Sequence, residues 1–360
     1  MITADKSVMR RALLGMMKAA GGRSAGRRPE YGAVVDLDAR LTVLGSLNMD
    51  ISVTVPALPG PGATVLGGAA AIAPGGKGAN QAVAAARLGA DSGIRVRMVG
   101  CVGDDDFGRT LRATLASEGI DDRAVRTVPG APTGIAMITV DESGENIITV
   151  APGANREVGA PEIAALSEPA AAGRTSVLVI SAEVPVTAIR AALEVPGGAR
   201  PLTVLNLAPA PPAEEAAGIL EARPDWLVVN ESEAAAVLGR PVSGLAEAAR
   251  AAAGLVAAGA RNAVVTAGAA GAAYHCEGLA SSGTVAAFPV RAVDTVGAGD
   301  TFVGALAVAL AGGIAPREAV TAAAAAGAAA AARPGTQAGM PRPADIRAAT
   351  GFAWPLDLAK

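Results

Sequence analysis

Residues 226–239, WLVVNESEAAAVLG, join a short apolar run directly to an alanine-rich stretch. WLVVN has the length and the β-branched valines of a buried strand, and the residues after it favour a helix that ends at Gly239. The same order recurs in SVLVIS (176–181) before a helix at about 186–195, in LTVLNLAPA (202–210) before another helix, and in NAVVTAGAAG (262–271) after a helix at 245–259. This alternation predicts an α/β fold with a mainly parallel sheet that helices cover on both faces.

The first half of the chain adds β segments to this pattern. The strands LTVLGSL (41–47) and RVRMVGCVG (95–103) and the helices KGANQAVAAARLGA (77–90) and DFGRTLRATLASEGI (106–120) belong to the alternating units. By contrast, ISVTVPAL (51–58) and ATVLGGAAAI (63–72) are predicted strands outside them, and TGIAMITVDESGENIITV (133–150) has the pattern of a β-hairpin. We expect these segments, about 51–73 and 133–150, to form a small β-sheet lid.

Composition narrows the possible functions. The chain has 360 residues, of which 51% are hydrophobic, 18% charged and only 2% aromatic, so its core must consist of Ala, Val, Leu and Ile. A net charge of −3 argues against broad nucleic-acid binding. Two cysteines and one histidine exclude a disulfide framework and a Cys/His zinc cluster, and they fit a reducing, cytoplasmic compartment. No apolar run free of charge and glycine has the length of a membrane span.

Residues 1–40 differ from the rest, with eight Lys/Arg against four Asp/Glu. Three interpretations stay open: a short signal peptide; a basic arm for nucleic acid or a remnant of another domain; and a poorly ordered tail or a start codon assigned too far upstream. We predict the last of these.

Polar residues gather at the predicted carboxyl ends of the strands, where parallel sheets bind ligands. They are Asn48 and Asp50, Glu183, Asn230 and Glu233, and the segment from Thr266 to Gly271. Lys77 stands out as well, because the chain has four lysines against 26 arginines and this is the only lysine between Leu41 and Ala359. Seven asparagines occur in all, and Asn48, Asn80 and Asn230 lie at strand ends or glycine turns.

Two of these motifs suggest contacts to hydroxyl groups. In GSLNMD (45–50), Asn48 and Asp50 lie two residues apart and share one face of an extended segment, unless they only form an Asx turn. PGGKGANQA (74–82) is not a P-loop, because Ala71 and Gly78 replace required residues. It is either a tight turn into a helix or a place where a polar ligand approaches closely, with the Asn80 amide facing hydroxyls.

The stretch VDTVGAGDTF (293–302) places an aspartate after a glycine turn at a predicted helix start. Phe302 occupies the last glycine position of a dinucleotide-binding motif, so that motif is absent. The N–H groups of residues 297–300 can converge on developing negative charge, and Asp300 can take a proton from a hydroxyl. The alternative is a simple capped helix. His275 lacks a G-x-S-x-G partner motif and is predicted to be a surface residue.

The motifs and their order resemble the ribokinase (phosphofructokinase-B-like) family of carbohydrate kinases over about residues 41–346. The matching segments are GSLNMD, GGKGANQAVAAARLGA, GDDDFG, ESGENIITV, PGAN, LNLAPA, VNESEA and VDTVGAGDTFVGAL. The resemblance implies a three-layer α/β sandwich with a small β-sheet lid in a kinase domain at 41–350, followed by a tail at 351–360. It also implies a homodimer formed through the lid.

The resemblance assigns roles by position. It implies sugar contacts from Asn48, Asp50, Gly76, Lys77, Asn80, Glu183 and Asp300, with Asp300 as general base and Gly297, Ala298 and Gly299 forming the anion hole. Nucleotide contacts are implied for Asn230, Thr266, Ala267, Gly268, Ala269, Ala270, Gly271, Gly299 and Ala324. A potassium site is implied at Asp294, Val296, Ala330, Arg333, Gly335 and Gly339, and an indirect magnesium contact at Glu233. Ala324 replaces a frequent histidine of the family, and Gly339 lacks the side-chain oxygen found there.

The activity implied by the resemblance is ATP-dependent phosphorylation of D-ribose at O5, with Mg²⁺ and K⁺ as cofactors. Two alternatives stay open. One is a kinase of the same family for deoxyribose, fructose, a nucleoside or a sugar phosphate. The other is a sugar-responsive regulator whose basic N-terminal arm contacts DNA.

Overall fold

The computed structural model describes residues 39–167, 176–195, 200–278 and 281–357. Apart from its last two residues, the predicted extension at 1–40 lies outside the described residues, as do residues 358–360 of the predicted tail.

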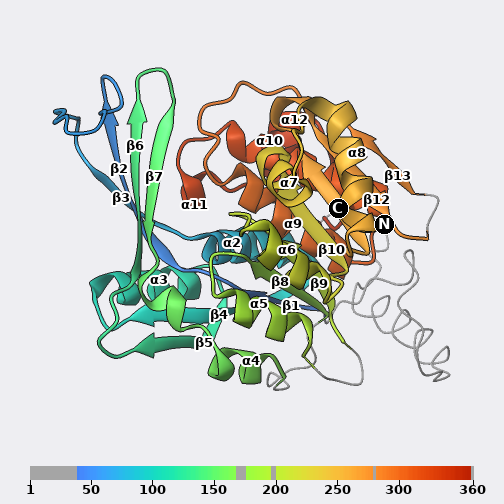
Figure 1. Cartoon of the computed structure of the whole chain (residues 1–360), viewed down its shortest axis with the longest axis horizontal. Helices are drawn as coiled ribbons and strands as arrows, with labels where there is room; N and C mark the ends of the chain where they lie inside the picture. The colour runs from blue at the N-terminus through green and yellow to red at the C-terminus, as the bar shows by residue number, and fades with distance from the viewer. Residues whose placement is uncertain (1–38, 168–175, 196–199, 279–280, 358–360) are drawn as a thin grey trace, which may run out of the picture.

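A nine-stranded sheet forms the centre of the molecule (Figure 1). Its strand order is β13-β12-β11-β10-β9-β8-β1-β4-β5. All pairs from β11 to β5 are parallel, while β12 and β13 are antiparallel. The strands are β1 (Arg40–Leu44), β4 (Arg95–Gly103), β5 (Asp121–Val128), β8 (Val177–Ser181), β9 (Leu202–Asn206), β10 (Trp226–Asn230), β11 (Asn262–Thr266), β12 (Ala272–Cys276) and β13 (Ser282–Val285). The predicted mainly parallel sheet is therefore confirmed.

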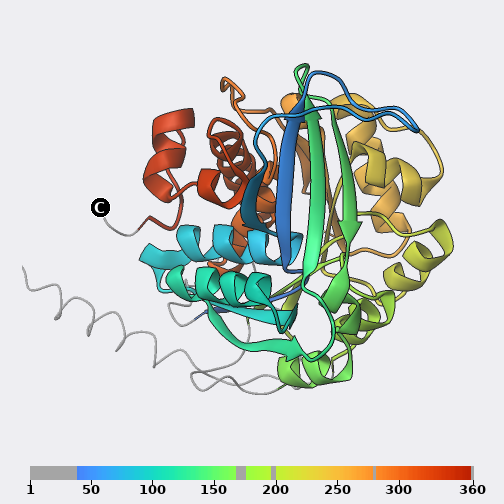
Figure 2. The same cartoon turned by 90° about the vertical axis from the view of Figure 1, so that its left-hand side faces the viewer.

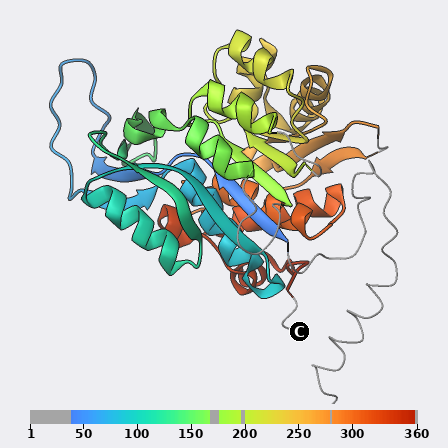
Figure 3. The ribbon, with the colours of Figure 1, turned by 90° about the horizontal axis from the view of Figure 1, so that it is seen from below.

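Helices cover both faces of this sheet, because alternate strand residues are apolar on each side. Leu41 and Val43 of β1 belong to one buried cluster and Leu44 to the other. Figure 3 shows the two helical layers from below. The first layer holds α2 (Lys77–Gly89), α3 (Asp106–Ser117), α9 (Ala298–Ala311), α10 (Pro316–Ala331) and α12 (Pro343–Thr350). The second holds α4 (Ala160–Ser167), α5 (Val186–Leu193), α6 (Ala213–Leu220), α7 (Glu231–Leu238) and α8 (Gly244–Ala257). The three-layer sandwich is thus confirmed.

A second sheet of four strands stands apart from the first, with the order β3-β2-β6-β7 (Figure 2). Its strands are β2 (Asn48–Val55), β3 (Ala71–Gly75), β6 (Gly134–Asp141) and β7 (Asn146–Ala151). The predicted hairpin is present as the antiparallel pair β6 and β7. The strand predicted at 63–72 is wrong: residues 63–70 have no regular structure, and only the last two residues of that range lie in β3. Its two glycines explain the difference, because glycine weakens a strand and gives it no side chain to pack.

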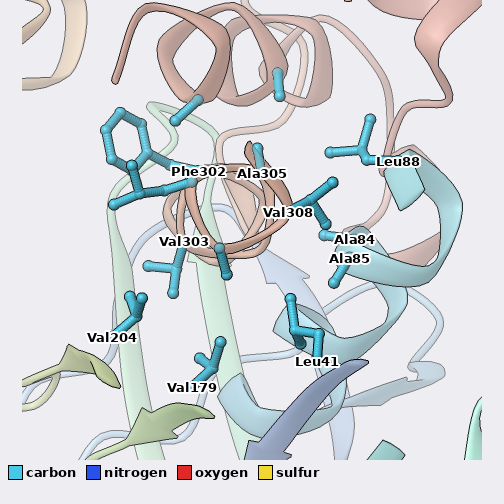
Figure 4. Close-up of a cluster of buried hydrophobic side chains, with 14 of the residues drawn as sticks. Leu41, Ala84, Ala85, Leu88, Val179, Val204, Phe302, Val303, Ala305 and Val308 are labelled. Carbon is cyan, nitrogen blue, oxygen red and sulfur yellow. The ribbon is translucent and has the colours of Figure 1, made fainter. Parts of the chain in front are cut away.

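Helix α9 is apolar on all sides and is packed between α2 and α10, so it is buried over almost its whole length. Figure 4 shows its side chains Phe302, Val303, Ala305 and Val308 together with buried side chains of α2 and of the strands. Gly304 lets α9 approach α2 closely: a Cβ at this position would lie 2.8 Å from the Gln81 carbonyl oxygen and 2.8 Å from the Ala84 Cβ. The close approach brings the first turn of α9 against the first turn of α2.

Candidate active site

The start of α2 lies directly on the backbone that leaves β1. A Cβ at Gly76 would lie 2.5 Å from the Asn48 backbone nitrogen, and one at Gly78 would lie 2.6 Å from the Gly45 carbonyl carbon. Gly76 also has a φ of 87°, which favours glycine. The glycines of GGKGAN are therefore needed for close backbone approach, and they bring GSLNMD and GGKGAN, about 30 residues apart in sequence, into one site.

Asp300 lies in the first turn of α9 and is 7% exposed. Each of its carboxylate oxygens accepts a hydrogen bond from an amide of α2. Asn80 Nδ2 donates to Asp300 Oδ2 at 2.9 Å, and Gln81 Nε2 donates to Asp300 Oδ1 at 3.1 Å. The carboxylate predicted to act as a base is thus held by two neutral donors rather than by a cation.

Three amides of this arrangement were not predicted from the sequence. Gln81 and Asn206 are joined by a bond of 2.9 Å, and Gln337 Nε2 donates to Asn80 Oδ1 at 3.0 Å. A compositional signal could have found two of them. The chain contains only two glutamines, Gln81 and Gln337, and both are buried around Asp300.

Asp50 extends from β2 toward the same site and lies over Gly75, where a Cβ would come 2.1 Å from its carboxylate. Its pKa is raised from 3.8 to about 7, mainly because burial removes water from the charged form. The negative charges of Glu183 and Asp300 raise this pKa further, while Lys77 lowers it. A carboxylate in this state gains from hydroxyl donors that a polar ligand can supply.

Lys77 is the cation of the site. Its pKa is raised above the ordinary value, chiefly by the negative charge of Asp300 and further by Glu183, Glu233 and Asp50. Asp50 and Lys77 therefore interact electrostatically with Asp300, and Glu183 interacts with both of them. The motif at 74–82 thus starts α2 and also places Lys77 among these charged groups.

Glu183, in the loop after β8, is fixed by two donors from the opposite side of the site. Ser46 Oγ donates to Glu183 Oε2 at 2.5 Å, and the Lys77 backbone N–H donates to the same oxygen at 3.3 Å. Ser46 is fully buried and was not predicted as a site residue, although it lies inside the GSLNMD motif.

Asn48 is placed where the two sheets join. Its Oδ1 accepts from Asn155 Nδ2 at 2.8 Å, and Asn155 Oδ1 accepts from the Leu47 N–H at 2.9 Å. Asn155 belongs to the one-turn helix η2 (Gly153–Glu157) that follows β7. The asparagine of the PGAN segment thus ties the end of the small sheet to its beginning, a role that the sequence did not predict.

The other junction of the two sheets is held by Asp105, the N-cap of α3. Its carboxylate accepts from Thr133 N at 2.7 Å, Thr133 Oγ1 at 2.6 Å and Gly108 N at 2.8 Å. Thr133 Oγ1 in turn accepts from the Gly103 N–H at 2.9 Å, so the start of β6 is bonded to the end of β4. The small sheet is therefore attached to the main one by polar contacts at both junctions.

Most of the predicted nucleotide residues lie around the ends of β10 and β11, whereas Gly299 lies on α9 and Ala324 on α10. Asn230 and Glu233 form a capping box at the start of α7, with mutual bonds of 2.8 Å. The pKa of Glu233 is raised, mainly by burial, while the bond to the Asn230 N–H and the charge of Lys77 lower it. The loop from Thr266 leads through η3 (Gly268–Ala270) to Gly271, and Ala324 lies half-buried on α10.

The predicted potassium residues come from two segments that Asp294 joins. Its Oδ1 accepts from the Val296 N–H at 2.9 Å, and its Oδ2 accepts from the Gly335 N–H at 3.0 Å. Gly339 ends the short helix α11 (Thr336–Gly339), and a Cβ there would lie 3.2 Å from the Arg333 carbonyl oxygen and 3.3 Å from that of Pro334. Oxygen donors of this kind suit a hard monovalent cation, while Ala330 O is already bonded to the Arg333 N–H.

The predicted anion hole is only partly free. In the turn before α9, the Ala298 N–H donates to the Thr295 carbonyl oxygen at 3.2 Å. Gly297 has a φ of 79°, a left-handed conformation that starts the helix and explains the glycine at that position. There is open space beside Gly299, since a Cβ there would meet no atom within 4 Å.

Two kinds of feature are absent from the described residues. Over residues 39–357, without the undescribed gaps, no group of three or more His, Cys, Asp and Glu side chains is arranged to hold a metal ion. Within the same part of the chain, no helix has the length and apolar character needed to cross a membrane. His275 lies half-buried on β12, and Cys101 and Cys276 are free and buried.

Comparison with known proteins places this geometry in a family. Residues 38–343 match the pfkB family carbohydrate kinases. The ribokinase of Haemophilus influenzae is 37% identical over 271 residues, 75% of this chain and 85% of that protein. The ribokinase of Schizosaccharomyces pombe is 35% identical over 306 residues, 84% and 94% of the two chains. A deoxyribokinase of Salmonella typhi is 35% identical over 267 residues, 74% and 84% of the two chains.

Solved structures agree with this result. The structure of Arabidopsis thaliana ribokinase complexed with ribose and ATP has a TM-score of 0.76 and 27% sequence identity, and the match covers 88% of this chain and 99% of that one. Because the family match spans most of the sequence, and because the predicted motifs meet in one site, the chain belongs to the pfkB family of carbohydrate kinases.

Proposed function

We propose that this carbohydrate kinase transfers the γ-phosphoryl group of ATP to O5 of D-ribose. The observation that carries the proposal is the position of Asp300, a buried carboxylate at a helix N-terminus with Asp50, Lys77 and Glu183 around it. Relatives named ribokinase are 35–37% identical, and a ribokinase complexed with ribose and ATP has the same fold. The deoxyribokinase relative supports 2-deoxyribose as the second candidate substrate.

In the proposed mechanism, Asp300 accepts the proton of the primary hydroxyl as its oxygen attacks the γ-phosphorus. Phosphoryl transfer depends mainly on positioning and charge neutralisation, and a general base typically adds about 10²–10⁴-fold. We propose that the N–H groups of Gly297, Gly299 and Asp300, at the positive end of α9, bind the equatorial oxygens of the transferring phosphoryl group. Lys77 adds a positive charge to this side of the site.

Asp50, Asn80 and Glu183 are proposed to bind the sugar hydroxyls. Closing the site removes water from these groups, and each buried polar group left unpaired costs about 1–3 kcal/mol. Asn230, Ala324 and the loop from Thr266 to Gly271 are proposed to contact the nucleotide. Mg²⁺, when bound, neutralises charge on the triphosphate, and Glu233 fits an indirect contact because its carboxylate already accepts from the Asn230 N–H.

The small sheet is proposed to act as a lid and as a homodimer interface. Its strands β3, β6 and β7 expose large apolar side chains on one face, with Ile72 60%, Met137 50% and Ile147 49% exposed. The register places them together, because Ile51 of β2 pairs with both Ile72 and Met137, and Thr139, two residues after Met137, pairs with Ile147. An apolar patch of this kind marks a surface that another chain covers.

The proposed location is the cytoplasm. ATP is available there, and its reducing conditions keep cysteines such as Cys101 and Cys276 free of disulfide bonds.

The test is ADP release from the full chain with ribose, 2-deoxyribose, fructose and nucleosides in turn. We expect the highest kcat/KM for ribose and a value about tenfold lower for 2-deoxyribose, which lacks one matched hydroxyl. A higher value for fructose or a nucleoside would contradict ribose as the substrate. Sugar binding without any ADP release would favour the regulator interpretation.

A further inference from the structure

Gln81 connects the central sheet to the Asp300 carboxylate. Its Nε2 lies 2.9 Å from Asn206 Oδ1 and 3.1 Å from Asp300 Oδ1, and its side chain is fully buried. Asn206 is itself fixed at the end of β9, because its Nδ2 donates to the Val228 carbonyl oxygen at 3.1 Å. The orientation of Asp300 is thus coupled through one amide to the parallel strands at the centre of the fold.

The Gln81 Nε2 group donates two hydrogen bonds, while its Oε1 atom accepts none from the described residues. Gln81 Oε1 is buried and has no hydrogen-bond partner among the described residues. A buried acceptor without a partner lowers stability, so a methionine of similar length would serve better if the residue only filled space. Keeping the amide is explained if its N–H group acts on Asp300.

The chemistry of the donor also matters. An arginine or lysine in this place would hold the carboxylate by opposite charge and weaken it as a proton acceptor. A neutral amide fixes the orientation of Asp300 while the carboxylate keeps its charge, and each oxygen still has a lone pair for the substrate hydroxyl.

We infer that Gln81 is a positioning residue for the base Asp300: by donating to Oδ1 it holds the carboxylate in the orientation needed for proton transfer. The inference rests on the proposed function. The other oxygen is held from the opposite side by Asn80, which Gln337 orients with a bond of 3.0 Å. Gln81 differs from Asn80 because Asn206 and Asp300 satisfy its donor group inside the protein, and its role needs no contact with the sugar.

The main test is Gln81→Met in the full chain, with kcat and KM for ribose measured separately. We expect kcat to fall about 10–100-fold, because a small misplacement of a reacting group costs up to about 10²-fold. KM for ribose should stay within about threefold of the parent value, since the sugar contacts remain. Thr301→Val is the matched control, because Thr301 is the next buried residue on α9 and its hydroxyl has no partner among the described residues. We expect no change in its kcat.

A second readout separates positioning from packing. In the Asp300→Asn background, Gln81→Met should lower the residual turnover by less than about twofold, because a residue that acts through the carboxylate has no effect once the carboxylate is gone. A further loss of about tenfold in that background would overturn the inference, as would an equal loss of kcat in Thr301→Val. A folded Gln81→Met enzyme with the kcat of the parent would overturn it as well.

If thermal melting shows that Gln81→Met does not fold, Asn206→Leu decides instead. It removes the acceptor that orients Gln81, and we expect a smaller loss of kcat with KM unchanged; no loss would overturn the inference. Failure of the proposed function looks different. A parent without sugar kinase activity, or an Asp300→Asn enzyme as active as the parent, would remove the proposed function, whereas an inactive Asp300→Asn beside a fully active Gln81→Met removes only the role of Gln81.

Discussion

Two aspartates of the site, Asp300 and Asp50, are held in opposite ways. Asp300 lies at the start of a buried helix, and both of its oxygens accept from amides whose own partners lie in the core. Asp50 lies on a strand of the small sheet, among the charges of Glu183, Asp300 and Lys77, and its pKa is raised to about 7. Hydrogen bonds hold the Asp300 carboxylate in place without any substrate. The surroundings of Asp50 instead disfavour the charged form of its carboxyl group.

The difference indicates that the main sheet and the small sheet contribute differently to the proposed reaction. A base must be in place before proton transfer, so it belongs on the rigid main layer. If the small sheet closes over the sugar as proposed, the sugar hydroxyls would supply the donors that the Asp50 carboxylate lacks. The comparison predicts that changes at Asp300 affect turnover, while changes at Asp50 affect substrate choice and the response to pH.

The largest effect is expected for Asp300→Asn. Turnover should fall by about 10²-fold or more, because the amide cannot accept the proton of the attacking hydroxyl. ADP release measured at saturating ribose gives the turnover number, and calorimetric binding of ribose checks that the site is still formed. Turnover within a few-fold of the parent value would contradict the proposal that Asp300, unlike Asp50, accepts the proton.

Asp50→Ala should have the next largest effect. We expect kcat/KM for ribose to fall about tenfold or more, and the preference for ribose over 2-deoxyribose to weaken. Steady-state kinetics with both sugars measures this preference. Ser52→Ala, two residues along the same face of β2, is the matched control and should leave both values unchanged. An unchanged preference in Asp50→Ala would mean that Asp50 only shapes the strand end.

A smaller effect, of a few-fold, is expected from potassium. The bonds from Val296 and Gly335 to Asp294 join the loop before α9 to the segment after α10, and a bound cation would order the turn that carries Gly297. Activity should rise when K⁺ replaces tetramethylammonium at fixed ionic strength. Asp294→Asn should lose this response, and a flat response in the parent would show that the site does not bind potassium, consistent with the missing oxygen at Gly339.

The smallest effect is one on stability. The pKa of Asp50 is about 7 in the folded protein, against an ordinary value of 3.8 for an aspartate in an unfolded chain, so the folded protein binds an additional proton between these two pH values. Stability therefore falls as the pH rises toward 7 and stays lowered above it. Asp50→Asn removes this loss, so its melting temperature should exceed that of the parent by about 2 °C or more at about pH 8, with a smaller difference at about pH 5. An equal difference at both pH values would contradict the raised pKa.

The sequence predicts the fold and part of the site. Alternation of strands and helices predicts the parallel sheet, and the strand-end positions of Asp50, Glu183 and Asn230 predict where the site lies. The segment at 63–72 could not be placed, since a composition of alanine and valine fits a strand while Gly67 and Gly68 oppose it. The contacts of Gln81 could not be predicted either, because Asp300 is 219 residues away and only the packing of α2 on α9 brings them together.

That packing has a consequence for attempts to make the enzyme more heat-resistant. Glycine inside a helix is usually about 0.5–1 kcal/mol less stable than alanine, so Gly304 in the middle of α9 is an obvious residue to replace. Here the added methyl group would press on the Gln81 carbonyl and on Ala84, and the two helices would have to move apart. Asp300 and the amides of Asn80 and Gln81 face each other across that contact, one turn earlier. A substitution chosen from helix propensity alone would therefore lower the activity of the enzyme it was meant to stabilise.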